Sequence, residues 1–137
     1  DENKNHVIPA LIKKIHNAKM KKQKSITLWG TGKAKREFIH VDDMASGIIH
    51  ILENYRENSP INLGTGEEVT IAKLSKTISK IIGYTGNINF DEKKPDGIKR
   101  KILSNKKLEK LKWKSRISLE KGLELAYLDY QNYLKKS

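Results

Sequence analysis

One histidine lies where it could move a proton. His6 ends a polar segment directly before a predicted helix, and such a position can leave an imidazole free for acid/base work near neutral pH. On the residues alone, an ordinary loop histidine is the alternative. His16 and His50 fall inside predicted helices and fit partly exposed packing roles. The histidines have no metal-ligand spacing and the chain has no cysteine, so the sequence predicts no metal site.

A second group of residues has the chemistry of a nucleotide site. Trp29 and Arg36 lie within eight residues of each other, on either side of a Gly-Thr-Gly turn. The ring could stack on a base and the guanidinium could bind a diphosphate. Asp96, in a Lys-Pro-Asp-Gly turn, could accept hydrogen bonds from a base or from sugar hydroxyls. The alternatives are a packed tryptophan, a solvated arginine and an aspartate that serves only its turn.

Neither Gly-Thr-Gly turn, at 30–32 or at 64–66, is a dinucleotide fingerprint. That device needs G-x-G-x-x-G between a strand and a helix. The third glycine is missing after both turns, and the first turn is followed by a predicted strand. Both are therefore interpreted as plain turns.

The elements that must position these residues follow from apolar periodicity and turn signals. Helices are predicted over 7–18, 44–55, 71–82, 105–111 and 119–134. Strands are predicted over 25–29, 37–41, 61–63 and 87–90. Asp42 or Asp43, Thr70 and Ser118 are the expected helix caps, and Gly83 is the expected helix end. The class is α/β, with few short strands and four to five helices. So few strands for so many helices indicate a missing partner domain, without which an exposed apolar face could drive self-association.

Composition excludes several classes. The 137 residues suit one small domain, and no apolar run approaches the roughly 18 residues of a membrane span. With no export leader recognisable, we expect a cytoplasmic protein without a membrane partner.

The net charge of +12 suggests either a polyanion partner or a lysine-rich surface, and only four of the 28 basic residues are arginine. Because arginine leads in base and phosphate recognition, the surface interpretation is favoured.

Several motifs together resemble the C-terminal part of the GDP-L-fucose synthase family, within the extended short-chain dehydrogenases. The resemblance runs nearly end to end. Its general superfamily motifs are the Arg-Glu-Phe-Ile-His-Val-Asp-Asp run at 36–43 and Asn-Leu-Gly-Thr-Gly at 62–66. The motifs that select this family are His-Val-Ile-Pro-Ala-Leu-Ile at 6–12, Trp-Gly-Thr-Gly at 29–32 and Lys-Pro-Asp-Gly at 94–97.

The resemblance implies a reaction and a set of roles. The family epimerises GDP-4-keto-6-deoxymannose at two carbons beside its ketone, and then reduces the ketone with NADPH. The histidine matching His6 would be the acid/base, next to the nicotinamide. The residues matching Lys14, Trp29, Arg36 and Asp96 would contact the GDP-sugar, with Lys14 supplying a point charge. A homodimeric parent enzyme without a nucleic-acid partner is expected.

The chain also departs from the family. The glycine-rich cofactor loop, the Ser and Tyr-x-x-x-Lys catalytic set and an epimerising cysteine match no part of it. Residues 1–137 are therefore expected to be the C-terminal substrate-binding portion, with the dinucleotide-binding domain outside it and no turnover by this chain alone. The alternatives are the substrate domain of another NAD(P)-dependent sugar-nucleotide epimerase or dehydratase, or a basic nucleic-acid-binding module.

Overall fold

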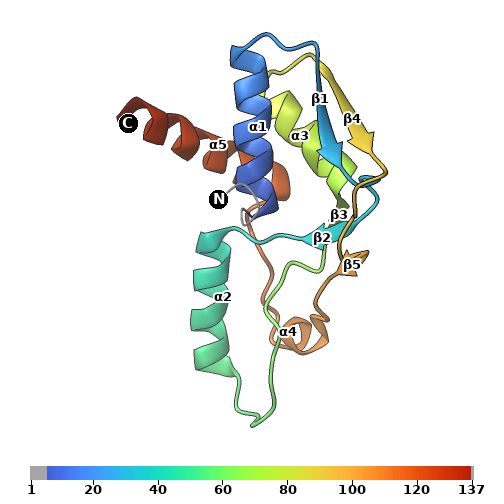
Figure 1. Ribbon diagram of the computed structural model, residues 1–137. Helices are drawn as coiled ribbons and strands as arrows, with labels where there is room; N and C mark the ends of the chain where they lie inside the picture. The colour runs from blue at the N-terminus through green and yellow to red at the C-terminus, as the bar shows by residue number, and fades with distance from the viewer. Residues whose placement is uncertain (1–5, 137) are drawn as a thin grey trace.

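The computed structural model describes residues 6–136, which form five helices and five strands and confirm the predicted α/β class (Figure 1). The helices are α1 (Val7–Met20), α2 (Val41–Asn54), α3 (Ile71–Ile82), α4 (Lys106–Lys110) and α5 (Leu119–Lys136). The strands are β1 (Ser25–Trp29), β2 (Lys35–Glu37), β3 (Glu68–Thr70), β4 (Asn87–Asp91) and β5 (Arg100–Lys101).

The strands form two small sheets. Strands β1 and β4 pair in parallel, from Ser25 opposite Asn87 to Trp29 opposite Asp91. The second sheet has the order β3-β2-β5, with β2 antiparallel to β3 and parallel to β5. Because β1 and β4 end together, the loops that leave them start side by side. These loops carry the Gly-Thr-Gly turn at 30–32 and the Lys-Pro-Asp-Gly turn at 94–97.

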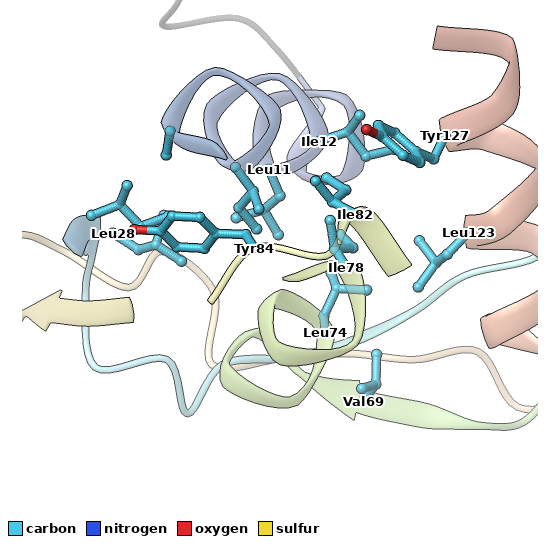
Figure 2. Close-up of a cluster of buried hydrophobic side chains, with 13 residues drawn as sticks. Leu11, Ile12, Leu28, Val69, Leu74, Ile78, Ile82, Tyr84, Leu123 and Tyr127 are labelled. Atoms are coloured by element: carbon cyan, nitrogen blue, oxygen red, sulfur yellow. The ribbon is translucent and has the colours of Figure 1, made fainter. Parts of the chain in front are cut away.

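The main core lies where α1, α3 and α5 meet strand β1 (Figure 2). The predicted apolar stripes supply it, because burying aliphatic side chains is the main favourable term in folding. Ile15 and Leu74 are fully enclosed, and Leu123 of α5 closes one side. The rest of the buried cluster comprises Leu11, Ile12, Ala18, Ile26, Leu28, Val69, Ile78, Ile82, Tyr84 and Tyr127.

Local signals predicted the ends of two helices correctly. The Thr70 hydroxyl accepts a hydrogen bond from Lys73 N at 3.1 Å and caps α3. Gly83 ends that helix in the left-handed conformation, at φ 74°, which glycine adopts without steric cost. The Ser118 hydroxyl accepts from Lys121 N at 3.2 Å, so the predicted start of α5 is also confirmed.

The predicted strand over 37–41 was wrong in its position. Only Lys35–Glu37 pair, and the chain turns into α2 at Val41. The His40 imidazole accepts from Asp42 N at 3.3 Å and is the side chain that caps α2. Asp42 and Asp43 therefore lie in the first turn of the helix, where negative charge suits the helix dipole, and neither is the cap.

The predicted strand over 61–63 was also wrong. This segment joins no ladder, and the Asn62 amide instead donates to Ser104 O at 3.2 Å. Strands β3 and β5 were not predicted, since two or three residues carry almost no periodic signal. In the final helix, Leu134 lies outside the core with 42% of its surface exposed.

Helix α2 lies away from the main core, beside α4 and the segment that follows it (Figure 1). The His50 imidazole is 2.8 Å from Leu111 O, and the Trp113 indole donates to the Ser46 hydroxyl at 3.3 Å. These contacts involve one face of α2 and leave apolar side chains on the other. None of the helices within 6–136 is long and apolar enough to cross a bilayer.

Candidate functional site

Trp29 presents its ring at the end of β1. The residue pairs with Asp91 in the sheet, yet 62% of its surface is exposed. The Lys94 ammonium lies 5.5 Å from the centre of the ring, within cation–π range. The predicted alternative of a packed tryptophan does not hold, because most of the residue is exposed and an ammonium lies over its ring.

Asp96 is bound to the turn that follows Trp29. Its two carboxylate oxygens accept hydrogen bonds from Thr31 N and from the Thr31 hydroxyl, each at 2.6 Å. The hydroxyl bond, followed by the backbone bond, holds the pKa of Asp96 below its ordinary value. Asp96 therefore keeps its charge at neutral pH and holds two loops together across 65 positions of sequence.

A glycine, Gly30, allows the loop that carries Asp96 to come close to the turn after Trp29. Gly30 has φ 82°, and a Cβ placed on it would lie only 3.1 Å from Asp96 Cα and closer still to its carboxylate. Gly30 N donates to Asp91 O at 3.0 Å, and Lys94 N donates to the same oxygen at 3.1 Å. The two loops are thus joined at both ends of the 91–96 segment.

Arg36 reaches the same region from β2. Its guanidinium donates to Lys35 O at 2.8 Å. A Cβ placed on Gly97 would lie 3.9 Å from Arg36 Nη2, so the guanidinium lies beside the Lys-Pro-Asp-Gly turn. Three of the four predicted substrate-binding residues, Trp29, Arg36 and Asp96, are therefore brought together. With Lys94 they are called the Trp29 cluster below.

Lys14 lies next to this cluster rather than inside it. Its exposed ammonium, on α1, donates to Thr27 O at 2.7 Å, two residues before Trp29 on β1. An ammonium has three donors, so two remain for a ligand.

His6 immediately precedes α1 and is exposed. Its carbonyl accepts from Ala10 N at 3.1 Å, while its imidazole makes no capping bond to the helix. Helix α1 begins near the level at which β1 finishes, in the middle part of the molecule (Figure 1). The structure therefore gives His6 an exposed ring at the start of α1, and among the described residues it brings none of the Trp29 cluster into contact with that ring.

Sequence reasoning missed Thr31 and Glu37. Glu37 accepts hydrogen bonds from Gly66 N at 2.7 Å and Leu103 N at 2.9 Å. Each Gly-Thr-Gly turn thus holds a carboxylate from elsewhere in the chain: Asp96 at the first turn and Glu37 at the second. The only sequence signal for Glu37 was its position next to Arg36. The residues that Glu37 and Thr31 bind are distant in sequence and gave no signal.

His16 and His50 pack as predicted. His16 lies 3.1 Å from the Tyr127 hydroxyl and meets the Tyr130 ring edge-on. His50, on α2, lies 2.8 Å from the carbonyl oxygen of Leu111, which follows α4. Among residues 6–136, no group of three or more histidine or acidic side chains could hold a metal ion.

Comparison with known proteins gives consistent likenesses. The model of the NAD dependent epimerase/dehydratase family matches residues 1–64. GDP-L-fucose synthase of Escherichia coli (strain K12) is 45% identical over 131 residues, covering 89% of this chain and 41% of the relative.

Part of each of two solved structures has the same fold as this chain. The GDP-L-fucose synthetase of Naegleria fowleri bound to NADP has a TM-score of 0.87 at 27% identity, covering 97% of this chain and 42% of that one. GDP-mannoheptose C4 reductase of Campylobacter jejuni with NADP bound has a TM-score of 0.80 at 32% identity, covering 93% of this chain and 45% of that one. The chain spans less than half the length of each of these three proteins.

The resemblance predicted from the motifs is thereby confirmed: over about nine-tenths of its length, this chain is a homologue of one part of the GDP-L-fucose synthases.

Proposed function

We propose that this chain is the GDP-sugar-binding portion of a GDP-L-fucose synthase that epimerises and then reduces GDP-4-keto-6-deoxymannose. The observation that carries the proposal is the Trp29 cluster, in which Trp29, Arg36 and Asp96 converge from three separate segments. The likeness to proteins named for GDP-sugar chemistry supports the same ligand.

Each member of the cluster suits one part of a nucleotide. The exposed Trp29 ring offers a flat surface for a base. The Asp96 carboxylate, although bound by Thr31, retains lone pairs that can accept from a base N–H or a hydroxyl. The Arg36 guanidinium can pair with a diphosphate through two parallel hydrogen bonds, and Lys14 can add a point charge.

His6 is proposed as the acid/base of the epimerisations. A ketone acidifies the C–H groups beside it, so a neighbouring imidazole can take up or deliver a proton on the face of the sugar that it meets, and a second acid/base group outside this chain must serve the opposite face. The imidazole is exposed and makes no capping bond to α1, which leaves both ring nitrogens accessible for this work.

NADPH, which supplies the hydride for ketone reduction, does not fit the Gly-Thr-Gly turns. In the first turn Thr31 N already donates to Asp96, and in the second Gly66 N already donates to Glu37, so neither N–H group is free for a pyrophosphate. We therefore assign cofactor binding to the dinucleotide-binding domain of a longer protein, and propose that residues 1–137 correspond to the substrate-binding portion. The apolar face of α2 supports a domain partner of this kind. The homodimeric parent enzyme stays a prediction.

The test is a calorimetric titration of the chain with GDP. We expect binding that survives added salt and that weakens by about 10- to 100-fold in Arg36→Ala, the range for losing charged hydrogen bonds. Arg56→Ala is the matched control, since Arg56 donates to Leu52 O and Glu53 O at the end of α2. Equal affinities in the two variants would contradict the proposal. Tight RNA binding with a steep salt dependence would favour the nucleic-acid module.

Turnover is a second test. Incubated with NADPH and GDP-4-keto-6-deoxymannose, the chain alone should leave the NADPH absorbance unchanged, and a steady decrease would refute the assignment of the cofactor site to another domain.

The second candidate is a portion of an enzyme acting on a different GDP-sugar. The likeness to a GDP-mannoheptose reductase favours it specifically. Comparing the affinities of GDP, GDP-mannose and GDP-fucose would test this. Equal affinities indicate a site that recognises the nucleotide alone, and different ones indicate a site that also recognises the sugar.

A further inference from the structure

The hydroxyl of Thr31 has a fixed role in its turn. It donates to Asp96 Oδ2 at 2.6 Å and accepts from Lys33 N at 3.2 Å, while Thr31 N donates to Asp96 Oδ1. A threonine has one hydroxyl proton and one backbone proton, and both are directed at Asp96. Thr31 therefore has no donor left for a ligand, and both of its donors act on Asp96.

Asp96 in turn sets the course of the loop that carries it. Two residues before it, Lys94 lies over the Trp29 ring, and one residue after it, Gly97 lies beside Arg36. Released from Thr31, Asp96 would keep the backbone bond from Gly32, and the start of the loop would keep the bonds from Lys93 N and Lys94 N to Asp91. The two bonds from Thr31 are thus the strongest ones that hold Asp96, and with it the end of the loop that carries Lys94, next to the turn that follows Trp29.

We propose that Thr31 is a positioning residue of the GDP-sugar site, which holds Asp96 and Lys94 in place around Trp29 without touching the ligand. The inference rests on the proposed function, and it adds that the Trp-Gly-Thr-Gly motif contributes a loop clamp as well as a stacking ring. The lowered pKa of Asp96 agrees with it, because the largest cause is the Thr31 hydroxyl.

The experiment compares Thr31→Val, which keeps the shape and the backbone N–H but removes the hydroxyl, with Thr31→Ser, which keeps the hydroxyl. Carboxyl carbon NMR measures the pKa of Asp96, the nuclear Overhauser effect between Lys94 Hε and the Trp29 ring measures their proximity, and calorimetry measures GDP affinity. In Thr31→Val we expect a raised Asp96 pKa, a weakened Overhauser effect and GDP binding weakened by about tenfold. Thr31→Ser should restore all three.

Thr65→Val is the control for deleting a Gly-Thr-Gly hydroxyl as such. The Thr65 hydroxyl lies 3.4 Å from Glu37 Oε1 and accepts from Glu67 N, an arrangement like that of Thr31. It should leave the Asp96 pKa and the Lys94–Trp29 proximity unchanged.

The outcomes separate the two proposals. An Asp96 pKa and a Lys94–Trp29 proximity that are the same in Thr31→Val and Thr31→Ser would overturn the clamp, whatever the affinity for GDP. Equal GDP affinities in the two variants, with binding intact, would overturn its role in the site. If the unmodified chain binds no GDP, the proposed function fails, while a raised pKa and a lost Overhauser effect still support Thr31 as the residue that positions Lys94.

Discussion

Carboxylates are the residues that hold the loops of this basic chain in place. Asp96, Glu37 and Asp43 each accept hydrogen bonds from backbone N–H groups far away in sequence. A charged acceptor makes such bonds stronger than a neutral one does, and two N–H groups satisfied by one side chain tie a loop down firmly. With 16 acidic residues against 28 basic ones, few carboxylates are available, and several serve structure.

Asp43 is the most deeply enclosed of the three, with 3% of its surface exposed. Its carboxylate accepts from Arg116 N and Ile117 N, the latter at 2.8 Å, which fixes the segment between α4 and α5 against α2. In Asp43→Ala both N–H groups lose their partner, and we expect the free energy of unfolding to fall by about 1–3 kcal/mol. Urea denaturation measures the change.

Asp43→Asn is the matched variant, because Oδ2 accepts from both Arg116 N and Ile117 N, and an amide oxygen in its place can still accept these bonds without the charge. Its loss of stability should be smaller than that of the alanine variant. Equal stability of all three proteins would mean that the carboxylate does not hold the 116–117 segment.

At the scale of elements, the local signals at both ends of α3 and at the start of α5 were read correctly, whereas the cap of α2 and the long-range strand pairings were not. Thr70 begins α3 and Gly83 ends it through contacts within four residues. The nearby sequence is therefore sufficient to predict both ends of this helix. The pairing of β2 with β3 and β5 joins segments more than thirty residues apart, and such short strands have no period to detect. The predicted strand over 37–41 failed for a related reason: its apolar residues precede a helix capped by His40.

The candidate site divides in the same way. Trp29, Arg36 and Asp96 could be chosen because their chemistry is visible in the motifs. That Thr31 binds Asp96 could not be foreseen, because either residue alone reads as an ordinary turn residue and 65 positions separate them.

Glu68 links all three strands of the second sheet. On β3, it accepts from Lys35 Nζ of β2 and from Arg100 Nε of β5, each at 2.6 Å. The Lys35 bond, and then the Arg100 bond, lower the pKa of Glu68. A depressed pKa in the folded state means that this stabilisation is complete above the ordinary glutamate value and is lost as the pH falls through the folded value.

Glu68→Gln should therefore loosen β5 at neutral pH and remove that part of the pH dependence. Hydrogen exchange at Lys35 N, which donates to Lys99 O at 2.9 Å, reports on the β2–β5 contact. Exchange should be faster in Glu68→Gln than in the unmodified chain, and the difference should shrink under acid. Glu67→Gln, at the exposed neighbouring position, is the control, and equal effects of the two would refute the three-strand link.

At the scale of the whole molecule, the charge and the apolar surface point to different conclusions. The lysine surplus lies largely on exposed positions, as expected for a solvated surface. The apolar surface of α2 is less ordinary. Val41, Ile48 and Leu52 recur at helical spacing on one face, with Ile49 beside them, and they are 48–71% exposed. Contiguous apolar surface of this kind is typical of an interface.

We expect the isolated chain to self-associate through this face of α2, because burying exposed aliphatic side chains is favourable and the opposite face is occupied by Trp113 and Leu63. Sedimentation velocity over a range of concentrations should show mass that rises with concentration. Leu52→Lys should shift the chain toward monomer without loss of helix content. Leu128→Lys is the matched control, since Leu128 is a 52% exposed leucine on α5. A monomer at every concentration, or equal dissociation by both substitutions, would show that α2 is not the associating surface.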